Sequence, residues 1–247
     1  AQVIWLNHSS HPLLTVALCM SCAITSATRA WLERWIIKEN LCPFAKKVHD
    51  RHRVRIAVSQ ASTRAGFCAD FSYELDLIRR GLLDTEAIDP GSTAKAAMRS
   101  TTDRAEASGE QSLPETTLLV SDPQSFPELA SADLMAFTSL SYQLQAIISD
   151  NNLVDDVQVV LFHPLLRKGA GLYSEYAPDD DGNPSDFIVR SPYPTYHLLR
   201  QRDVYDVVKA GAQFVEEVPA RNAQKIAAMG DGVRARWEAA KQAAEAE

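Results

Sequence analysis

Apolar side chains recur at three- and four-residue spacing in several stretches of the chain, which is typical of helices with one buried face. The first of these helices is predicted to start after Ser26 or Thr28, either of which can serve as its N-cap. The apolar positions of the predicted helices are Trp31, Leu32, Trp35 and Ile36; Phe71, Leu75, Ile78 and Leu82; Leu134, Phe137, Leu140, Leu144 and Ile147 within a long helix from Phe126 to Ser149; and Val204, Val207 and Val208.

Three short runs predict strands. Val54 to Val58 alternates between apolar and polar residues, Thr116 to Val120 reads as a buried strand, and Val157 to Phe162 is the most strongly β-prone run of the chain. Strands therefore alternate with helices that are long enough to make parallel crossovers. The fold class predicted is α/β, a single domain with a small mixed or parallel sheet flanked by helices and with helical N- and C-terminal extensions.

The pattern divides the chain into an apolar N-terminal extension (1–25), a core domain (26–218) and a helical tail (219–247). Within the core, residues 84–115 are rich in Ala, Ser, Thr and acidic residues and have no aromatic residue, so they are predicted to be a low-complexity insertion. The apolar stretch Leu13 to Ala27 has three interpretations: the remnant of a targeting segment, a core helix, or a segment inserted into a partner. In the tail, Gly230 and Gly232 are expected to kink or divide the helix.

Composition limits the class of protein. Of 247 residues, 46% are hydrophobic and 23% are charged, which is ordinary for a soluble globular protein. The net charge of −7 disfavours a general nucleic-acid binder, which usually carries a basic surplus. No nucleic-acid partner is therefore expected.

The cysteines indicate no metal site. Cys19 and Cys22 form a CxxC pair, but no second pair of Cys or His completes a zinc set, and the pair lies in an apolar stretch. Cys42 precedes Pro43, which favours the first turn of a helix, so the thiolate could gain from the helix dipole and serve as a nucleophile. The alternative is that Cys42 is a small buried residue.

His163 directly follows the strand from Val157 to Phe162. Ligands of α/β sheets bind at the carboxyl ends of strands, so His163 is a candidate general base, metal ligand or anion donor. A loop histidine whose hydrogen bonds are satisfied inside the protein is the alternative.

The run Val189 to Arg200 holds the densest set of polar candidates: Arg190, Ser191, Tyr193, His197 and Arg200. Its two prolines hold Ser191 and Tyr193 in extended geometry, and a helix is predicted from Thr195, which would put His197 and Arg200 on one face. Arginines at the start of a helix favour a carboxylate or phosphate ligand. The alternative is a Pro-rich corner whose arginines are buried against acidic partners such as Asp186 or Asp203.

Three motifs, NLCPFA at Asn40 to Ala45, FHP at Phe162 to Pro164 and RSPYPxxHLLR at Arg190 to Arg200, together resemble the uncharacterised family catalogued as domain of unknown function 1415. The resemblance spans Trp31 to Val208 without the insertion. It implies relatives but no reaction or cofactor. The chain departs from the family pattern at Val189, where Asn is usual, and at Gln201, where Glu is frequent.

Two functions follow as hypotheses. In the first, His163, His197 and Cys42 are catalytic and Arg190, Ser191, Tyr193 and Arg200 bind a small anionic ligand, so that Cys42, His163, Arg190 and His197 converge in space. In the second, the chain is a non-catalytic accessory subunit of a larger, possibly organellar, assembly, with protein partners bound through the N-terminal segment and the C-terminal helix. An organelle (mitochondrion or plastid) or the cytoplasm fits either.

Overall fold

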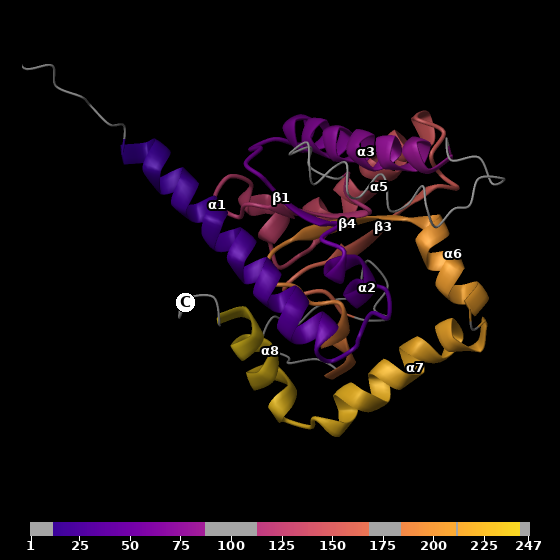
Figure 1. Ribbon diagram of the computed structural model, residues 1–247. Helices are drawn as coiled ribbons and strands as arrows, with labels where there is room; N and C mark the ends of the chain where they lie inside the picture. The colour runs from indigo at the N-terminus through magenta and orange to yellow at the C-terminus, as the bar shows by residue number, and fades with distance from the viewer. Residues whose placement is uncertain (1–11, 87–112, 168–183, 211, 243–247) are drawn as a thin grey trace, which may run out of the picture.

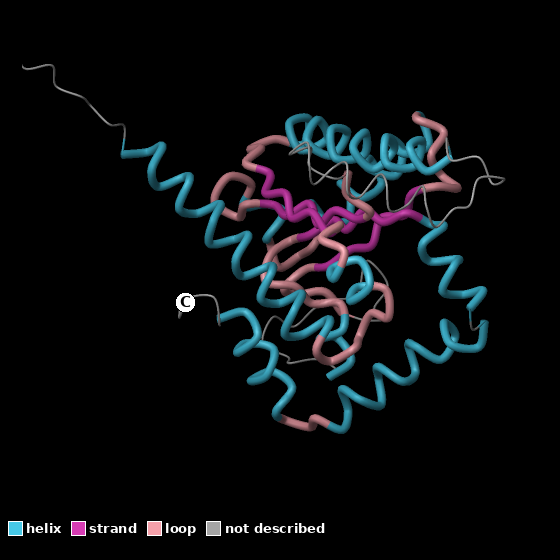
Figure 2. Tube along the Cα trace, viewed as in Figure 1, coloured by secondary structure: helices cyan, strands magenta, loops and turns pink. Residues whose placement is uncertain are grey.

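A computed structural model describes residues 12–86, 113–167, 184–210 and 212–242. Four strands form one sheet in the order β1-β2-β4-β3. Their bounds are Val54–Ser59 (β1), Thr116–Ser121 (β2), Val157–Phe162 (β3) and Thr195–Arg200 (β4). The mixed sheet and its flanking helices confirm the predicted α/β class, and Figure 2 shows the strands running between two layers of helices.

One face of the sheet is covered by α3 (Arg64–Glu86) and α5 (Met135–Asp150), which lie above it in Figure 1. The other face is covered mainly by N- and C-terminal helices. Their bounds are Pro12–Trp31 (α1), Leu32–Ile37 (the π-helix η1), Ala45–Asp50 (α2), Gln201–Ala210 (α6), Ala212–Ala228 (α7) and Gly232–Gln242 (α8), and two 3₁₀ turns, η2 and η3, span Pro127–Ala130 and Pro184–Ile188. Among the described residues, no helix has the length and apolar character needed to span a bilayer.

The predicted helix from Thr195 is wrong, because residues 195–200 form β4 at the centre of the sheet. β4 pairs antiparallel with both β2 and β3, so its backbone groups are satisfied from two sides, which a local helical spacing cannot reveal. Tyr196 and Leu198 alternate into one core cluster, as strand side chains do. In a strand, His197 and Arg200 lie on opposite faces of the sheet, and the helix α6 begins only at Gln201.

Two helix boundaries also differ from the prediction. α1 runs through Ser26 and Thr28, and the Thr28 hydroxyl donates to the carbonyl of Ile24 inside the helix instead of capping a new one. The predicted helix from Phe126 is divided into η2 and α5, because Leu134 adopts left-handed geometry with φ of 56°. The Asp133 carboxylate then accepts the backbone N–H of Met135 at 3.1 Å and so helps to start α5.

Several predictions fall partly on residues outside the described ranges. These are residues 1–11 of the N-terminal extension, residues 87–112 of the insertion and residues 243–247 of the tail. Where the end of the insertion is described, it is tied to the core: the side chain of Arg53 donates to the carbonyl of Leu113 at 2.9 Å, and Glu115 pairs with Arg51. The division of the tail is confirmed, since a turn at Gly230 separates α7 from α8.

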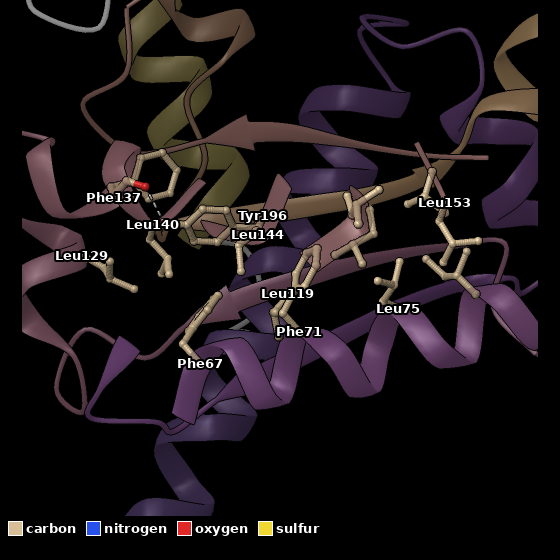
Figure 3. Close-up of a cluster of buried hydrophobic side chains, with 14 of the residues drawn as sticks. Phe67, Phe71, Leu75, Leu119, Leu129, Phe137, Leu140, Leu144, Leu153 and Tyr196 are labelled. Carbon is tan, nitrogen blue, oxygen red and sulfur yellow. Dashed lines mark hydrogen bonds between the residues drawn. The ribbon is translucent and has the colours of Figure 1, made fainter. Parts of the chain in front are cut away.

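The core has one cluster on each side of the sheet. The α3/α5 side is built around rings of Phe67, Phe71, Phe137 and Tyr196, which Figure 3 shows converging between helix and strands. The Tyr196 hydroxyl donates to the carbonyl of Phe137 at 2.8 Å, so β4 is linked to α5. The opposite side is built around tryptophans and aliphatic residues of α1, η1 and α8, including Trp31, Trp35 and Trp237.

Tyr196→Phe is expected to reduce the free energy of unfolding by about 1 kcal/mol, because it removes a buried hydrogen bond while keeping the ring. Urea denaturation measures the loss. Tyr142→Phe, on the exposed side of the helix α5 that contains Phe137, is the matched control and should leave the stability unchanged. Equal stabilities of all three proteins would contradict the structural role of the hydroxyl.

Candidate functional site

His163 lies at the carboxyl edge of the sheet, where β1, β2 and β3 all end. Both ring nitrogens are used inside the protein: Nε2 donates to the carbonyl of Leu129 at 3.0 Å, and Nδ1 accepts the N–H of Leu165 at 3.1 Å. The side chain is 0% exposed, and this burial lowers its pKa from 6.5 to about 4. The described contacts are those of a neutral loop histidine with satisfied hydrogen bonds.

His197 points to the opposite face of the sheet from Tyr196. Its Nε2 donates to the hydroxyl oxygen of Thr116 at 2.6 Å, while that hydroxyl donates to the carbonyl of Leu198. The ring also packs against Phe162, with centroids 6.0 Å apart. Burial lowers the pKa of His197 to about 4, so the imidazole is neutral near pH 7.

The two arginines of the candidate set have acidic partners within the protein. Arg190 is 5% exposed, and its guanidinium stacks over the Phe187 ring with Asp186 3.8 Å away. Arg200, also 5% exposed, donates to Asp203 at 2.7 Å and lies 3.4 Å from Glu115. Each arginine is therefore buried beside an acidic residue, Arg190 near Asp186 and Arg200 near Asp203. This is the alternative that the sequence analysis gave for these arginines.

Ser191, Tyr193 and Cys42 occupy local roles. The Ser191 hydroxyl donates to the carbonyl of Tyr193 at 2.6 Å, which tightens the Pro-rich turn. Burial raises the pKa of the Tyr193 phenol, and the nearby carboxylate of Asp122 raises it further.

Cys42 precedes α2 as expected, but burial raises the pKa of its thiol and outweighs the backbone N–H groups of Phe44 and Ala45. The direction of this shift does not favour the thiolate, and a catalytic role for Cys42 stays a prediction.

The backbones of two candidate residues, His163 and Arg190, lie close together, but their side chains lie on different sides of the sheet. The N–H of His163 donates to the carbonyl of Val189, next to Arg190. The His163 ring, however, packs against Phe137 of α5, with centroids 4.9 Å apart, whereas Arg190 lies on Phe187 in the cluster on the other side of the sheet. A shared catalytic or anion-binding role for these residues stays a prediction.

Among the described residues, no group of three or more His, Cys, Asp or Glu side chains is placed to hold a metal ion. A hollow of about 410 Å³ lies at the start of α3 and α5 and is lined by Arg64, Glu128 and Asp133. Charges of both signs line it, so it offers no clear preference for an anion.

In the sheet formed by the described residues, β1 is an edge strand. A larger groove of about 860 Å³ follows its outer edge, a volume within the range of ligand sites. We call it the β1-edge groove. α1 contributes Ser21 and Thr25 to one wall, α3 contributes Asp70, Tyr73 and Glu74 to the other, and residues 56–61 form the floor. Sequence reasoning missed these residues, since the position of a strand at the edge of a sheet is set by pairings far apart in the chain.

The backbone of β1 presents hydrogen-bonding groups to this groove. The carbonyls of Arg53 and Ser59 accept bonds from β2 and the residue after it, through the N–H groups of Thr116 and Asp122. In a parallel pair, alternate residues bond to the same neighbour, so Arg55 and Ala57 also face β2. The N–H and C=O groups of the intervening residues therefore point to the free edge; these residues are Val54, Ile56 and Val58.

The α3 wall of the β1-edge groove is polar. Glu74 is buried and accepts two hydrogen bonds from Arg55, at 2.7 and 2.9 Å. One turn earlier, Asp70 accepts the Ser59 hydroxyl at 2.6 Å. Tyr73, between them in sequence, is 57% exposed. Carboxylates and an aromatic ring thus flank an open strand edge.

Fold and contacts together define a single α/β domain with a mixed four-stranded sheet, extended by helices at both ends. The chain belongs to the family described as Protein of unknown function (DUF1415), whose model matches residues 23–88 and 87–236. The resemblance inferred from the three motifs is thereby confirmed. No curated protein and no solved structure matches the chain significantly.

Proposed function

We propose that the protein is a non-catalytic binding subunit that takes up an extended segment of a partner protein as an added strand along β1. The observation that carries this proposal is the β1-edge groove, whose floor is a strand with outward backbone groups that have no hydrogen-bond partner among the described residues. Strand addition satisfies such groups through main-chain hydrogen bonds, while alternate side chains of the partner meet the walls. This is a specific form of the accessory-subunit hypothesis.

The shape of the groove favours one extended segment over the other occupants. α1 and α3 both line the groove, and the N-terminal part of α1 projects beyond the sheet in Figure 1. A second copy of the chain, paired edge to edge, would bring its own α1 and α3 into the space between these walls. A single strand needs only about 5 Å beside β1.

A library of random twelve-residue peptides displayed on phage, selected on the purified protein, tests the proposal. Affinities of the enriched peptides are measured by fluorescence anisotropy. Val58→Pro is expected to weaken binding about tenfold or more, because proline removes an outward N–H and fills the edge. Tyr142→Ala, which removes an exposed ring from α5 outside the groove, should leave the affinity unchanged. Peptides whose affinity is unchanged by Val58→Pro, or is also weakened by Tyr142→Ala, would contradict strand addition.

The same alternation predicts the stability of two proline variants. Ala57→Pro removes an N–H that bonds to β2, whereas Val58→Pro removes one that faces the free edge. Ala57→Pro is therefore expected to be less stable than Val58→Pro by about 1–3 kcal/mol, as measured by urea denaturation. The reverse order would show that the outward assignment of Val58 is wrong.

A further inference from the structure

We infer that the β1-edge groove selects a partner segment with a lysine or arginine side chain, held between the Asp70 carboxylate and the Tyr73 ring. The inference rests on the proposed strand addition and specifies its partner. It is carried by two neighbouring groups of α3 that line the groove and by the charge of the wall around them.

The first group is the carboxylate of Asp70. Its Oδ2 accepts the hydroxyl of Ser59, a neutral donor, and the contacts of the described residues give it no Lys or Arg partner. Glu74 differs, since Arg55 holds both of its oxygens. Asp70 is half-buried, and a partly desolvated carboxylate with remaining acceptor capacity gains most from a charged donor.

The second group is the ring of Tyr73. Residues three apart on a helix are neighbours on its surface, so Tyr73 lies beside Asp70 on the side of α3 that lines the groove. The ring is 57% exposed, and its face attracts a cation within about 6 Å. A carboxylate next to an aromatic ring suits an ammonium or guanidinium group and disfavours an anion.

The strand geometry sets where the basic residue sits. Side chains of an added strand alternate between the α1 wall and the α3 wall, and those on the α3 side lie beside Arg55, Ala57 and Ser59. The Arg55 guanidinium disfavours a second cation at its end of the groove. The basic side chain therefore belongs at the Ser59 end, next to Asp70.

Parallel phage selections on the wild-type protein and on Asp70→Asn test this inference. Asn retains an oxygen that can accept the Ser59 hydroxyl, so the fold is expected to survive. The wild-type protein should enrich Lys or Arg at one fixed position, and Asp70→Asn should enrich strand-forming peptides without it. For the most enriched peptide, made synthetically, Asp70→Asn in the protein should weaken binding by about five- to tenfold, and so should Lys→Gln in the peptide. When the two changes are combined, their effects on the binding free energy should not add.

Tyr73 supplies an independent comparison. Tyr73→Ala should weaken the same peptide about threefold, and Tyr73→Phe should keep the affinity, because the ring face remains. If Val58→Pro weakens binding of the peptides but they show no preference for a basic residue, or no coupling to Asp70, this inference is wrong and strand addition still holds. If Val58→Pro leaves their affinity unchanged, both this inference and strand addition are wrong.

Discussion

Lowering the pH from 7 to 4 is expected to cost the folded protein about 3 kcal/mol of stability through His163 alone. The pKa of this histidine is about 4 in the folded state and 6.5 in its ordinary environment. Because the unfolded chain binds the proton more tightly, His163 destabilises the fold progressively as the pH falls from 6.5 towards 4. Well above pH 6.5 both states carry a neutral ring and the effect vanishes.

Urea denaturation at pH values between 4 and 7 measures this effect. In His163→Gln, which has no titrating ring at this position, the slope of the free energy of unfolding against pH should be smaller by about 1.4 kcal/mol per pH unit. His52→Asn is the matched control, since His52 is exposed and its positive φ of 56° is one that Asn tolerates. An unchanged pH dependence in His163→Gln would contradict the neutral, buried state of His163. His197 is expected to act in the same direction, because burial also lowers its pKa to about 4.

Arg190→Met is expected to destabilise the protein by about 3–5 kcal/mol, because it leaves the buried carboxylate of Asp186 without its guanidinium partner. The double variant Arg190→Met/Asp186→Leu removes both charges and should regain most of the loss. Arg34→Met, which removes an exposed arginine from η1, is the control and should have little effect. Urea denaturation of the wild type, Arg190→Met, Asp186→Leu and the double variant measures the coupling between the two residues.

Phosphate separates this structural role from the anion-binding hypothesis. If Arg190 serves the fold, adding phosphate should not shift the wild-type unfolding midpoint. A rise in the wild-type midpoint with phosphate, absent in Arg190→Lys, would support the anion pocket instead, since a ligand that binds only the folded state stabilises it. Equal stability of Arg190→Met and wild type would contradict the buried pair.

The sequence predicted most of the layers but not the central strand. The strands at 54–58, 116–120 and 157–162 were readable because their apolar runs are short and β-rich. For residues 195–200, the spacing of His197 and Arg200 also fits a helix, and only pairing with β2 and β3 selects the extended form. Burial of Tyr196 and Leu198 in the core then outweighs local preference.

The candidate site was less predictable than the fold. The sequence singled out polar residues by type, and it could name Asp186 and Asp203 as acidic partners only as an alternative; the structure places both beside the arginines. The β1-edge groove had no sequence signal of its own. Asp70 and Tyr73 look like solvent-facing helix residues until the order of the strands puts an open edge beside them.

Amide hydrogen exchange of the peptide complex, followed residue by residue by NMR, tests the central claim most directly. In the free protein, the amide hydrogens of Ile56 and Val58 should exchange faster than those of Ala57 and Ser59, which bond to β2. When the selected peptide binds as an added strand, the amides of Ile56 and Val58 should become protected and Ala57 should change little. Protection elsewhere, with Ile56 and Val58 still exchanging freely in the saturated complex, would contradict strand addition at β1.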